Sequence, residues 1–105
     1  MENQRNIDIL LATYNGEQFL AEQIDSILGQ SNQDWQLLVR DDGSIDNTVG
    51  IVKEYVARYP DRIGLIEDDG CRLGASLNFQ RLLENSTADY IMFSDQDDVW
   101  LDRKI

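Results

Sequence analysis

Apolar residues along the chain fall into short continuous runs that alternate with longer segments in which they recur every three or four positions. Residues 7–12 form the first run, and the polar sequence from Thr13 to Gly16 ends it. A run of this length followed by turn residues is typical of a buried strand. From Glu17 onward the spacing predicts an amphipathic helix, whose inner face is expected to contain Phe19, Leu20, Gln23, Ile24, Ile27 and Leu28.

The same alternation continues to the end of the chain. Further strands are predicted over residues 35–40, 63–66 and 89–94, and a last helix near residue 99. A second helix is expected to be capped by Asp46, Asn47 or Thr48 and to end before Pro60. The buried face of this second helix is expected to contain Val49, Val52, Tyr55, Val56 and Tyr59. A third helix lies between the last two predicted strands, and its buried face is expected to contain Leu77, Phe79, Leu82 and Leu83.

Strands that alternate with helices predict right-handed βαβ crossovers, because parallel neighbours need a long connection across one face of the sheet. The expected fold class is therefore α/β, Rossmann-like, with a mainly parallel sheet and helices on both faces. The carboxyl ends of such strands share one edge of the sheet, where open α/β sheets bind ligands. Three polar segments are placed at that edge, namely residues 13–15, 41–42 and 95–98.

Composition narrows the class of partner. The chain has 105 residues, enough for one domain, and a formal net charge of −11, which opposes binding to nucleic acid. Cys71 is the only cysteine and histidine is absent, so a metal would have to be held by oxygen. The run at residues 7–12 is too short to span a membrane and lacks the pattern of a signal peptide. We expect a reduced, cytoplasmic chain.

The acidic turn at residues 95–98 contains Asp95, Asp97 and Asp98. Carboxylates this close repel one another unless a cation lies between them. Oxygen ligands suit Mg²⁺ or Mn²⁺, which proteins often hold together with the phosphates of a substrate. The alternative is structural: Asp95 caps the last helix and the other two occupy its first turn, where the helix dipole favours acidic side chains. Both interpretations stay open on the residues alone.

The other polar segments and one arginine have comparable alternatives. Asp41 and Asp42 can accept hydrogen bonds from a base or a ribose, although an Asp-Gly sequence is more typical of a turn. Residues 13–16 could meet an anion at a helix N-terminus or serve only as its cap. Arg72 could bind a phosphate or a base carbonyl, or it could only balance the acidic residues beside it.

Four stretches of the chain together resemble the N-terminal, nucleotide-sugar-binding part of family 2 glycosyltransferases, which have the GT-A fold. The similarity covers nearly the whole chain, and the DxD motif of the family is matched by Asp95 and Asp97. The form of the last stretch looks like that of transferases of bacterial surface polysaccharides, some of them rhamnosyltransferases. The four stretches read ILLATYNG from residue 9, IDSILGQS from 24, LVRDDGSIDNT from 38 and YIMFSDQDDVW from 90.

The resemblance implies a nucleotide site at the ends of the first two strands. Asp42, together with Asp41, would bind the pyrimidine ring. The pocket for the base and the ribose would be lined by the last residues of the first strand, Ala12, Thr13 and Tyr14. These roles are what family membership would imply, and the turn and capping interpretations of the same residues stand beside them.

The resemblance also implies a metal and a basic contact. Asp97 would coordinate a divalent ion, Mn²⁺ or Mg²⁺, that bridges the nucleotide diphosphate. Asp95 would lie near the ribose or a metal-bound water, as a second candidate metal ligand. Arg72 falls in the loop where some members place a basic residue that contacts the base.

The implied reaction transfers a sugar from a nucleotide-diphosphate donor to a hydroxyl of a carbohydrate or lipid-linked acceptor, with inversion. Residues 1–105 would be the nucleotide-sugar-binding part of a glycosyltransferase domain whose acceptor-binding part, with the general base, is absent. We expect this chain to bind the donor without full catalysis and to self-associate through its open sheet edge. The parent protein is expected to be peripheral at the inner face of the membrane.

Two rival functions remain. A magnesium-dependent phosphotransfer domain, such as a receiver domain, expects its acidic residues after the first strand, where this chain has Thr13, Tyr14 and Asn15. A non-catalytic nucleotide-binding module would keep the pocket and lack transfer. Donor binding without transfer would favour the second rival.

Overall fold

The computed structural model describes residues 6–68 and 72–94. Their elements follow one another as β1 (Ile7–Thr13), α1 (Glu17–Leu28), β2 (Trp35–Asp41), α2 (Thr48–Arg58), β3 (Ile63–Leu65), α3 (Ala75–Glu84) and β4 (Tyr90–Ser94). The strands form one parallel sheet in the order β3-β2-β1-β4. This confirms the α/β class and the strand–helix alternation, whereas the helix expected near residue 99 lies outside the described residues.

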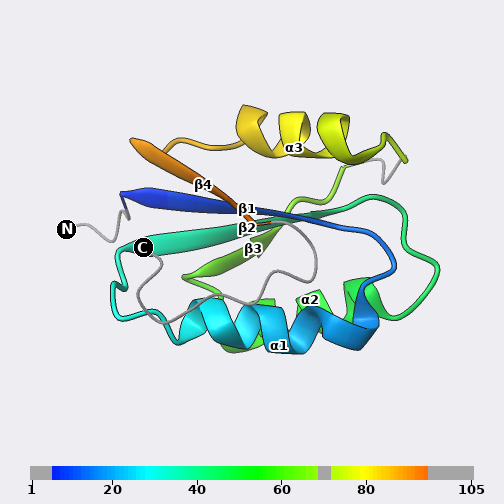
Figure 1. The fold of residues 1–105 in the computed structure, drawn as a ribbon, viewed down its shortest axis with the longest axis horizontal. Coiled ribbons are helices and arrows are strands. Elements are labelled where there is room, and N and C mark those ends of the chain that lie inside the picture. Colours follow the sequence, from blue (N-terminus) through cyan, green and yellow to red (C-terminus); the bar gives the residue numbers. More distant parts are fainter. Residues whose placement is uncertain (1–5, 69–71, 95–105) are drawn as a thin grey trace.

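The molecule has three layers, with α3 on one face of the sheet and α1 and α2 on the other (Figure 1). The main hydrophobic core lies on the α1/α2 face. It is built from side chains that are almost fully buried, which are Ile9, Leu11, Leu20, Ile24, Ile27, Trp35, Leu37, Val39, Val52, Tyr55 and Ile63. Apolar burial on this scale is the dominant favourable term in folding a domain of this size.

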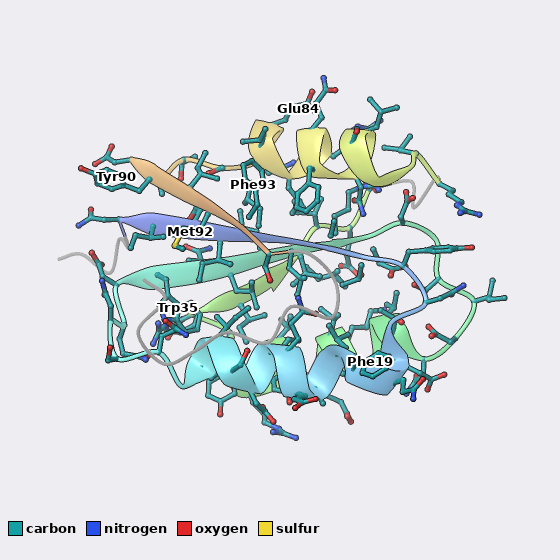
Figure 2. The ribbon with its side chains drawn as sticks, viewed as in Figure 1. Phe19, Trp35, Glu84, Tyr90, Met92 and Phe93 are labelled. Atoms are coloured by element: carbon teal, nitrogen blue, oxygen red, sulfur yellow. The ribbon has the colours of Figure 1, made fainter. Side chains whose placement is uncertain are left out.

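Side chains alternate between the two faces along each strand. In β1 and β2 the odd-numbered positions contribute to the α1/α2 core, whereas the even-numbered positions face α3. The α3 face is unusual because its buried side chains include the charged groups Asp8 and Arg40 beside the apolar Leu10 and Leu82. Figure 2 shows the same alternation in β4, where Met92 lies on the side of Trp35 and Phe93 lies beneath α3.

Four residues that were expected in the core are exposed. Phe19, Tyr59, Leu77 and Leu83 are between 38% and 49% exposed, so their prediction as core was wrong. Tyr59 is the C-cap of α2 and lies beyond its last helical turn. The helix α3 contributes Asn78 and Leu82 to the buried side instead, and Phe79 packs edge-on against Phe93 with ring centroids 5.3 Å apart.

At the amino end of the sheet, the buried Asp8 holds the connection from α3 to β4. Its Oδ2 accepts hydrogen bonds from the Ser86 hydroxyl at 2.6 Å and from the backbone N–H groups of Thr87 and Ala88 at 3.1 and 3.3 Å. Since an unpaired buried carboxylate is costly, these three donors explain how an acidic residue can occupy a buried position in β1.

β4 is one of the two edge strands of the described sheet, the other being β3. Tyr90 and Phe93 are 68% and 52% exposed, although both are large and apolar. The carboxyl end of β4 is fixed from the other face, where Gln23 of α1 donates a buried hydrogen bond to the Ser94 hydroxyl at 3.0 Å. Across the described residues, none of the helices combines the length and the apolar character needed to traverse a membrane.

Candidate functional site

The ends of β1 and β2 are joined by hydrogen bonds around Asp41. Thr13 is the register partner of Asp41, and its hydroxyl donates to Asp41 Oδ1 at 2.8 Å. The backbone N–H of Ser44 donates to Asp41 Oδ2 at 2.7 Å, and its hydroxyl donates to Oδ1. Thr13 and Asp41 are both buried. The carboxylate of Asp41 is therefore held rigidly by three donors at the carboxyl edge of the sheet.

The loops that follow β1 and β2 interlock. The backbone N–H of Asn15 donates to the Ser44 hydroxyl at 2.7 Å, and the N–H of Ile45 donates to Asn15 Oδ1 at 2.9 Å. Asn15 has a φ of 49°, in the left-handed region, which asparagine tolerates better than most residues. The N–H of Gly16 donates to the Thr48 hydroxyl at 2.8 Å. The two loops therefore form one rigid unit.

Asp46 connects the N-termini of two helices. It accepts hydrogen bonds from the N–H of Glu17 in α1 at 3.3 Å and from the N–H of Thr48 in α2 at 3.0 Å. The Thr48 hydroxyl also donates to it, and this bond is the main reason that the pKa of Asp46 is lowered. Of the three candidate caps for α2, Asp46 thus supplies the acceptor, while Asn47 at the N-cap position makes no side-chain cap bond.

Asp42 faces the opposite side of the sheet from Asp41. Its Oδ1 accepts from the N–H of Leu73 at 2.6 Å, and its Oδ2 accepts from the N–H of Gly74 at 3.0 Å. Gly74 has a φ of 87°, a conformation that costs glycine little. Asp42 therefore fixes the segment that leads into α3, and its carboxylate is almost completely buried.

A buried arginine stabilises this arrangement. The Nε and Nη2 atoms of Arg40 donate to the two carboxylate oxygens of Asp68 at 2.9 and 3.2 Å. Its Nη1 donates to Asn78 Oδ1 at 3.0 Å and lies 3.4 Å from Asp42 Oδ1. The hydrogen bond to Asp68 raises the pKa of Arg40 despite its burial, so the guanidinium stays charged. Asn78 donates in return to the backbone oxygen of Arg40 at 3.2 Å.

Arg40 was not among the residues singled out from the sequence. The available signal was a charged side chain at the end of an otherwise apolar strand, next to two acidic residues. Its partners Asp68 and Asn78 are 28 and 38 positions away. A sequence pattern does not reveal such distant pairs.

Arg72 and Tyr14 come together from different parts of the chain. The guanidinium carbon of Arg72 lies 4.1 Å from the centroid of the Tyr14 ring. This is a cation–π distance, and it places a basic group and an aromatic face side by side at the end of β1. Asp68, four positions before Arg72 in the chain, is paired with Arg40 and with Arg81, the latter at 3.1 Å.

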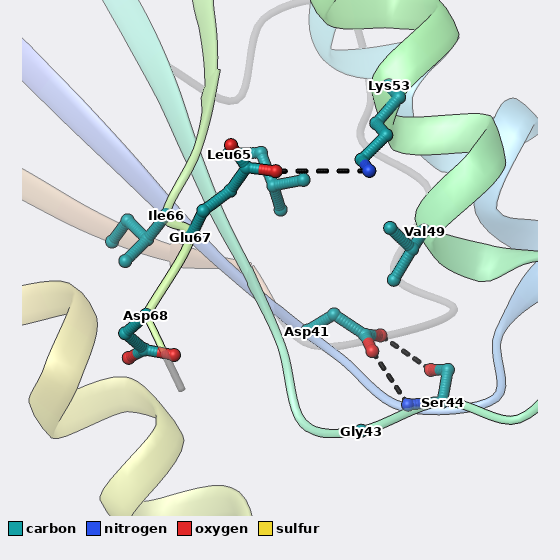
Figure 3. A pocket seen from close by; sticks show the side chains of 9 residues that line it. All are labelled: Asp41, Gly43, Ser44, Val49, Lys53, Leu65, Ile66, Glu67 and Asp68. Atoms are coloured by element: carbon teal, nitrogen blue, oxygen red, sulfur yellow. Dashed lines mark hydrogen bonds and ion pairs between the residues drawn. The ribbon is translucent and has the colours of Figure 1, made fainter. Parts of the chain in front are cut away.

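A cavity of about 260 Å³ opens on the α2 side of the same edge (Figure 3). Lys53 and Glu67 form an exposed ion pair, with Nζ and Oε1 3.9 Å apart. Asp41 contributes to the wall, whereas Asp42 faces α3. The lining residues come from the end of β2, from α2 and from the segment after β3, and are Asp41, Gly43, Ser44, Val49, Lys53, Leu65, Ile66, Glu67 and Asp68.

The structure thus places five of the expected nucleotide-binding residues at the carboxyl edge of the sheet: Thr13, Tyr14, Asp41, Asp42 and Arg72. Ala12 is a half-buried residue of β1 and pairs in register with Arg40.

The acidic turn with Asp95, Asp97 and Asp98 lies outside the described residues. β4 ends at this same edge, because Ser94 is the register partner of Leu11. Within residues 6–68 and 72–94, no three histidine, cysteine or acidic side chains gather in a way that could hold a metal ion.

The family model and two curated relatives that match this chain describe glycosyltransferases. The profile of Glycosyl transferase family 2 matches residues 8–105. The dTDP-rhamnosyl transferase RfbG of Shigella flexneri is 42% identical over 98 residues, which cover 90% of this chain and 34% of that protein. The UDP-Glc:alpha-D-GlcNAc-diphosphoundecaprenol beta-1,3-glucosyltransferase WfgD of Escherichia coli is 33% identical over 99 residues, covering 94% of this chain and 38% of that protein.

Solved structures show the same fold. The mannosyltransferase PcManGT from Pyrobaculum calidifontis, determined with GDP-Man and Mn²⁺, aligns with a TM-score of 0.80 over 90% of this chain and 28% of that chain. At 24% sequence identity this likeness concerns the fold. The chain spans about a third of the length of the two curated relatives described above.

Proposed function

The chain belongs to glycosyl transferase family 2, and from this premise we propose that the carboxyl edge of its sheet binds the nucleotide of a nucleotide-diphosphate sugar donor. The observation that carries the proposal is the position of Arg72 over the Tyr14 ring, beside the buried acceptors Asp41 and Asp42. An aromatic face can stack on a pyrimidine base, a guanidinium can donate to its carbonyl oxygens, and a carboxylate can accept from its ring N–H.

Each contact has a distinct role. The Tyr14 ring stacks on the base, and the Arg72 guanidinium donates to a base carbonyl. Asp42 accepts from the ring N–H: its carboxylate has about four acceptor positions, and the described donors, Arg40, Leu73 and Gly74, use three. Thr13 and Ala12 line the side of the pocket formed by β1, and Asp41 fixes the floor between the two strands.

The divalent ion is assigned to Asp97, with Asp95 as its neighbour. Asp41 and Asp42 are poor candidates for metal ligands because both carboxylates already accept several protein hydrogen bonds. The acidic residues that follow Ser94 are the remaining oxygen ligands expected at this edge, and they suit Mn²⁺ or Mg²⁺. When bound, such an ion stabilises the negative charge on a departing diphosphate.

The whole protein then transfers a sugar to an acceptor hydroxyl with inversion. The name of RfbG supports a dTDP-linked donor, and the name of WfgD supports a UDP-linked donor and a lipid-linked acceptor. We place the reaction in bacterial surface polysaccharide synthesis. If the protein glycosylates a lipid-linked acceptor, it lies in the cytoplasm, peripheral to the inner face of the membrane. No general base is assigned among the residues of this chain, so the 105 residues act as the donor-binding part without full catalysis.

The test is a calorimetric titration of the purified chain with dTDP, UDP and GDP, each with and without Mn²⁺. The expected result is metal-dependent binding in which dTDP or UDP is at least about tenfold tighter than GDP. Asp97→Ala should abolish the metal dependence, whereas the matched control Asp61→Ala, at an exposed aspartate, should leave it intact. A folded chain that binds none of the three nucleotides would contradict the proposal, as would unchanged metal-dependent binding by Asp97→Ala.

A further inference from the structure

Arg40 is a buried charged side chain that links three separate elements. It belongs to β2, it pairs through two hydrogen bonds with Asp68 after β3, and it donates to Asn78 of α3. Its side chain has no solvent-exposed area. Burying a guanidinium is expensive unless nearly all its donors are paired. An apolar residue of similar volume could not make the hydrogen bonds that Arg40 makes to Asp68 and Asn78.

The contacts of Arg40 continue toward the nucleotide site. Its Nη1 lies 3.4 Å from Asp42 Oδ1, and the same oxygen accepts from the N–H of Leu73 at 2.6 Å. Leu73 is the immediate neighbour of Arg72, whose guanidinium lies over Tyr14. A continuous path thus runs from the buried Arg40 through Asp42 and the backbone of residue 73 to the Arg72–Tyr14 pair.

We propose that Arg40 is a positioning residue for this site: it orients Asp42 and thereby holds Arg72 against the Tyr14 ring. Arg40 itself does not contact the nucleotide. The proposal rests on the proposed function, because the pair that it positions is the one assigned to the base. The planar guanidinium is required, because its N–H groups have a fixed arrangement that donates to Asp68, Asn78 and Asp42 together. A lysine ammonium lacks that geometry.

The geometric part of the proposal is tested by NMR on the full chain. Protons held against an aromatic face are shifted upfield, so the Arg72 side-chain protons should show such a shift, with Tyr14→Leu defining its absence. In Arg40→Lys we expect at least half of this shift to be lost. The matched control is Arg81→Lys, because Arg81 also donates to Asp68 but is partly exposed. It should keep the shift.

The functional part is tested by dTDP affinity in the same variants. Arg40→Lys should raise the Kd about tenfold, and Arg81→Lys should change it less than twofold. The proposal is overturned if folded Arg40→Lys keeps both the Arg72 shift and the dTDP affinity of the unmodified chain. If the unmodified chain shows the Arg72 shift but binds no nucleotide in the titration described above, the proposed function fails, and the positioning of Arg72 by Arg40 is judged on the shift alone.

A measurement on the unmodified chain removes any dependence on a variant folding. The backbone N–H groups of Leu73 and Gly74 donate to Asp42 in a segment without regular secondary structure. We expect their exchange with solvent deuterium to be slowed at least a hundredfold relative to the unstructured chain, an order-of-magnitude expectation for hydrogen bonds that open only by local unfolding. Unprotected exchange at both positions would overturn the proposal.

Discussion

The two faces of the sheet are stabilised in different ways. The α1/α2 face buries a continuous cluster of apolar side chains from β1, β2, β3 and both helices. The α3 face buries Asp8, Arg40 and Asn78 beside Leu10 and Leu82, and it leaves Phe93 largely exposed. The same strands contribute to both faces, since successive side chains alternate.

The apolar face and the polar face therefore have different roles: the first supplies folding free energy, and the second fixes the positions of polar groups. Apolar packing is non-directional, so the α1/α2 face can supply folding free energy without fixing any single polar atom. Hydrogen bonds are directional and costly to leave unmade. The network of Arg40, Asp42, Asp68 and Asn78 therefore determines where the segment before α3 lies. We expect substitutions in the apolar core of the first face to change stability alone and substitutions in this network to change the site.

The largest effect on stability is expected from Leu37→Ala on the apolar face. Leu37 is completely buried within the core cluster, and removal of its side chain should cost about 2–5 kcal/mol in the free energy of unfolding. Urea denaturation gives this value, and NMR in the folded state should show the Arg72 shift unchanged. Ile45→Ala, at a 90% exposed position, is the control and should change stability by less than about 0.5 kcal/mol. If Leu37→Ala lowered the free energy of unfolding by less than Ile45→Ala does, the apolar α1/α2 face would not be the main source of stability.

A smaller loss of stability is expected from Asp8→Asn, at a buried polar residue on the α3 face that lies away from the nucleotide site. The substitution removes the charge from an acceptor that binds Ser86, Thr87 and Ala88, and it should cost about 1–3 kcal/mol. Asp8 lies at the amino end of β1, far along the strand from Thr13. The dTDP affinity should stay within twofold. A tenfold weaker affinity would mean that the buried polar groups at the two ends of the sheet act as one network.

The burial of Tyr55 on the apolar face makes stability depend on pH above 10. Its hydroxyl donates to Asp25 Oδ1 at 2.7 Å, and burial is the main reason that its pKa rises to about 12 from an ordinary value of 10.0. The unfolded chain loses this proton first, so the contribution is fully present below pH 10 and disappears as the pH rises toward 12. Tyr55→Phe should cost about 1 kcal/mol at pH 7. Its urea midpoint should also fall less steeply than that of the unmodified chain between pH 10 and 12; equal slopes would refute the assignment.

The smallest effect is expected at Asp46, on the exposed rim that joins α1 and α2. Hydrogen bonds from Thr48 lower its pKa below the ordinary 3.8. The stabilisation is thus present above pH 3.8 and is lost as the pH falls through the lower pKa of the folded state. Asp46→Asn should reduce the acid sensitivity of the urea midpoint below pH 4, and Asp61→Asn is the exposed control. Identical acid sensitivity in the two variants would contradict the role of Asp46.

The apolar pattern was enough to predict the strands and the parallel α/β class, because strands buried on both faces appear as short continuous apolar runs and amphipathic helices show a spacing of three to four. It was wrong about Phe19 and Leu77, since the same spacing does not reveal how wide a strip of a helix the sheet covers. The alternation of β2 does explain why the adjacent Asp41 and Asp42 have separate partners.

The site was predictable in its location but not in its internal contacts. Thr13, Asp41 and Asp42 could be placed at the carboxyl edge because every parallel strand ends there. The stacking of Arg72 on Tyr14 and the pairing of Arg40 with Asp68 join residues far apart in the chain. Both contacts depend on the tertiary arrangement of segments that are distant in sequence, which no local pattern encodes.

One measurement tests the division between the two faces most directly: a titration of the ¹⁵N-labelled chain with dTDP and Mg²⁺, followed by backbone amide shifts. We expect the largest changes at residues 13–16, 42–44 and 72–74, with the amides around Asp8 and Trp35 nearly unchanged. No binding would contradict this expectation, and so would the largest changes lying in the apolar core cluster, as at Leu37 or Val52, or at residues 86–88.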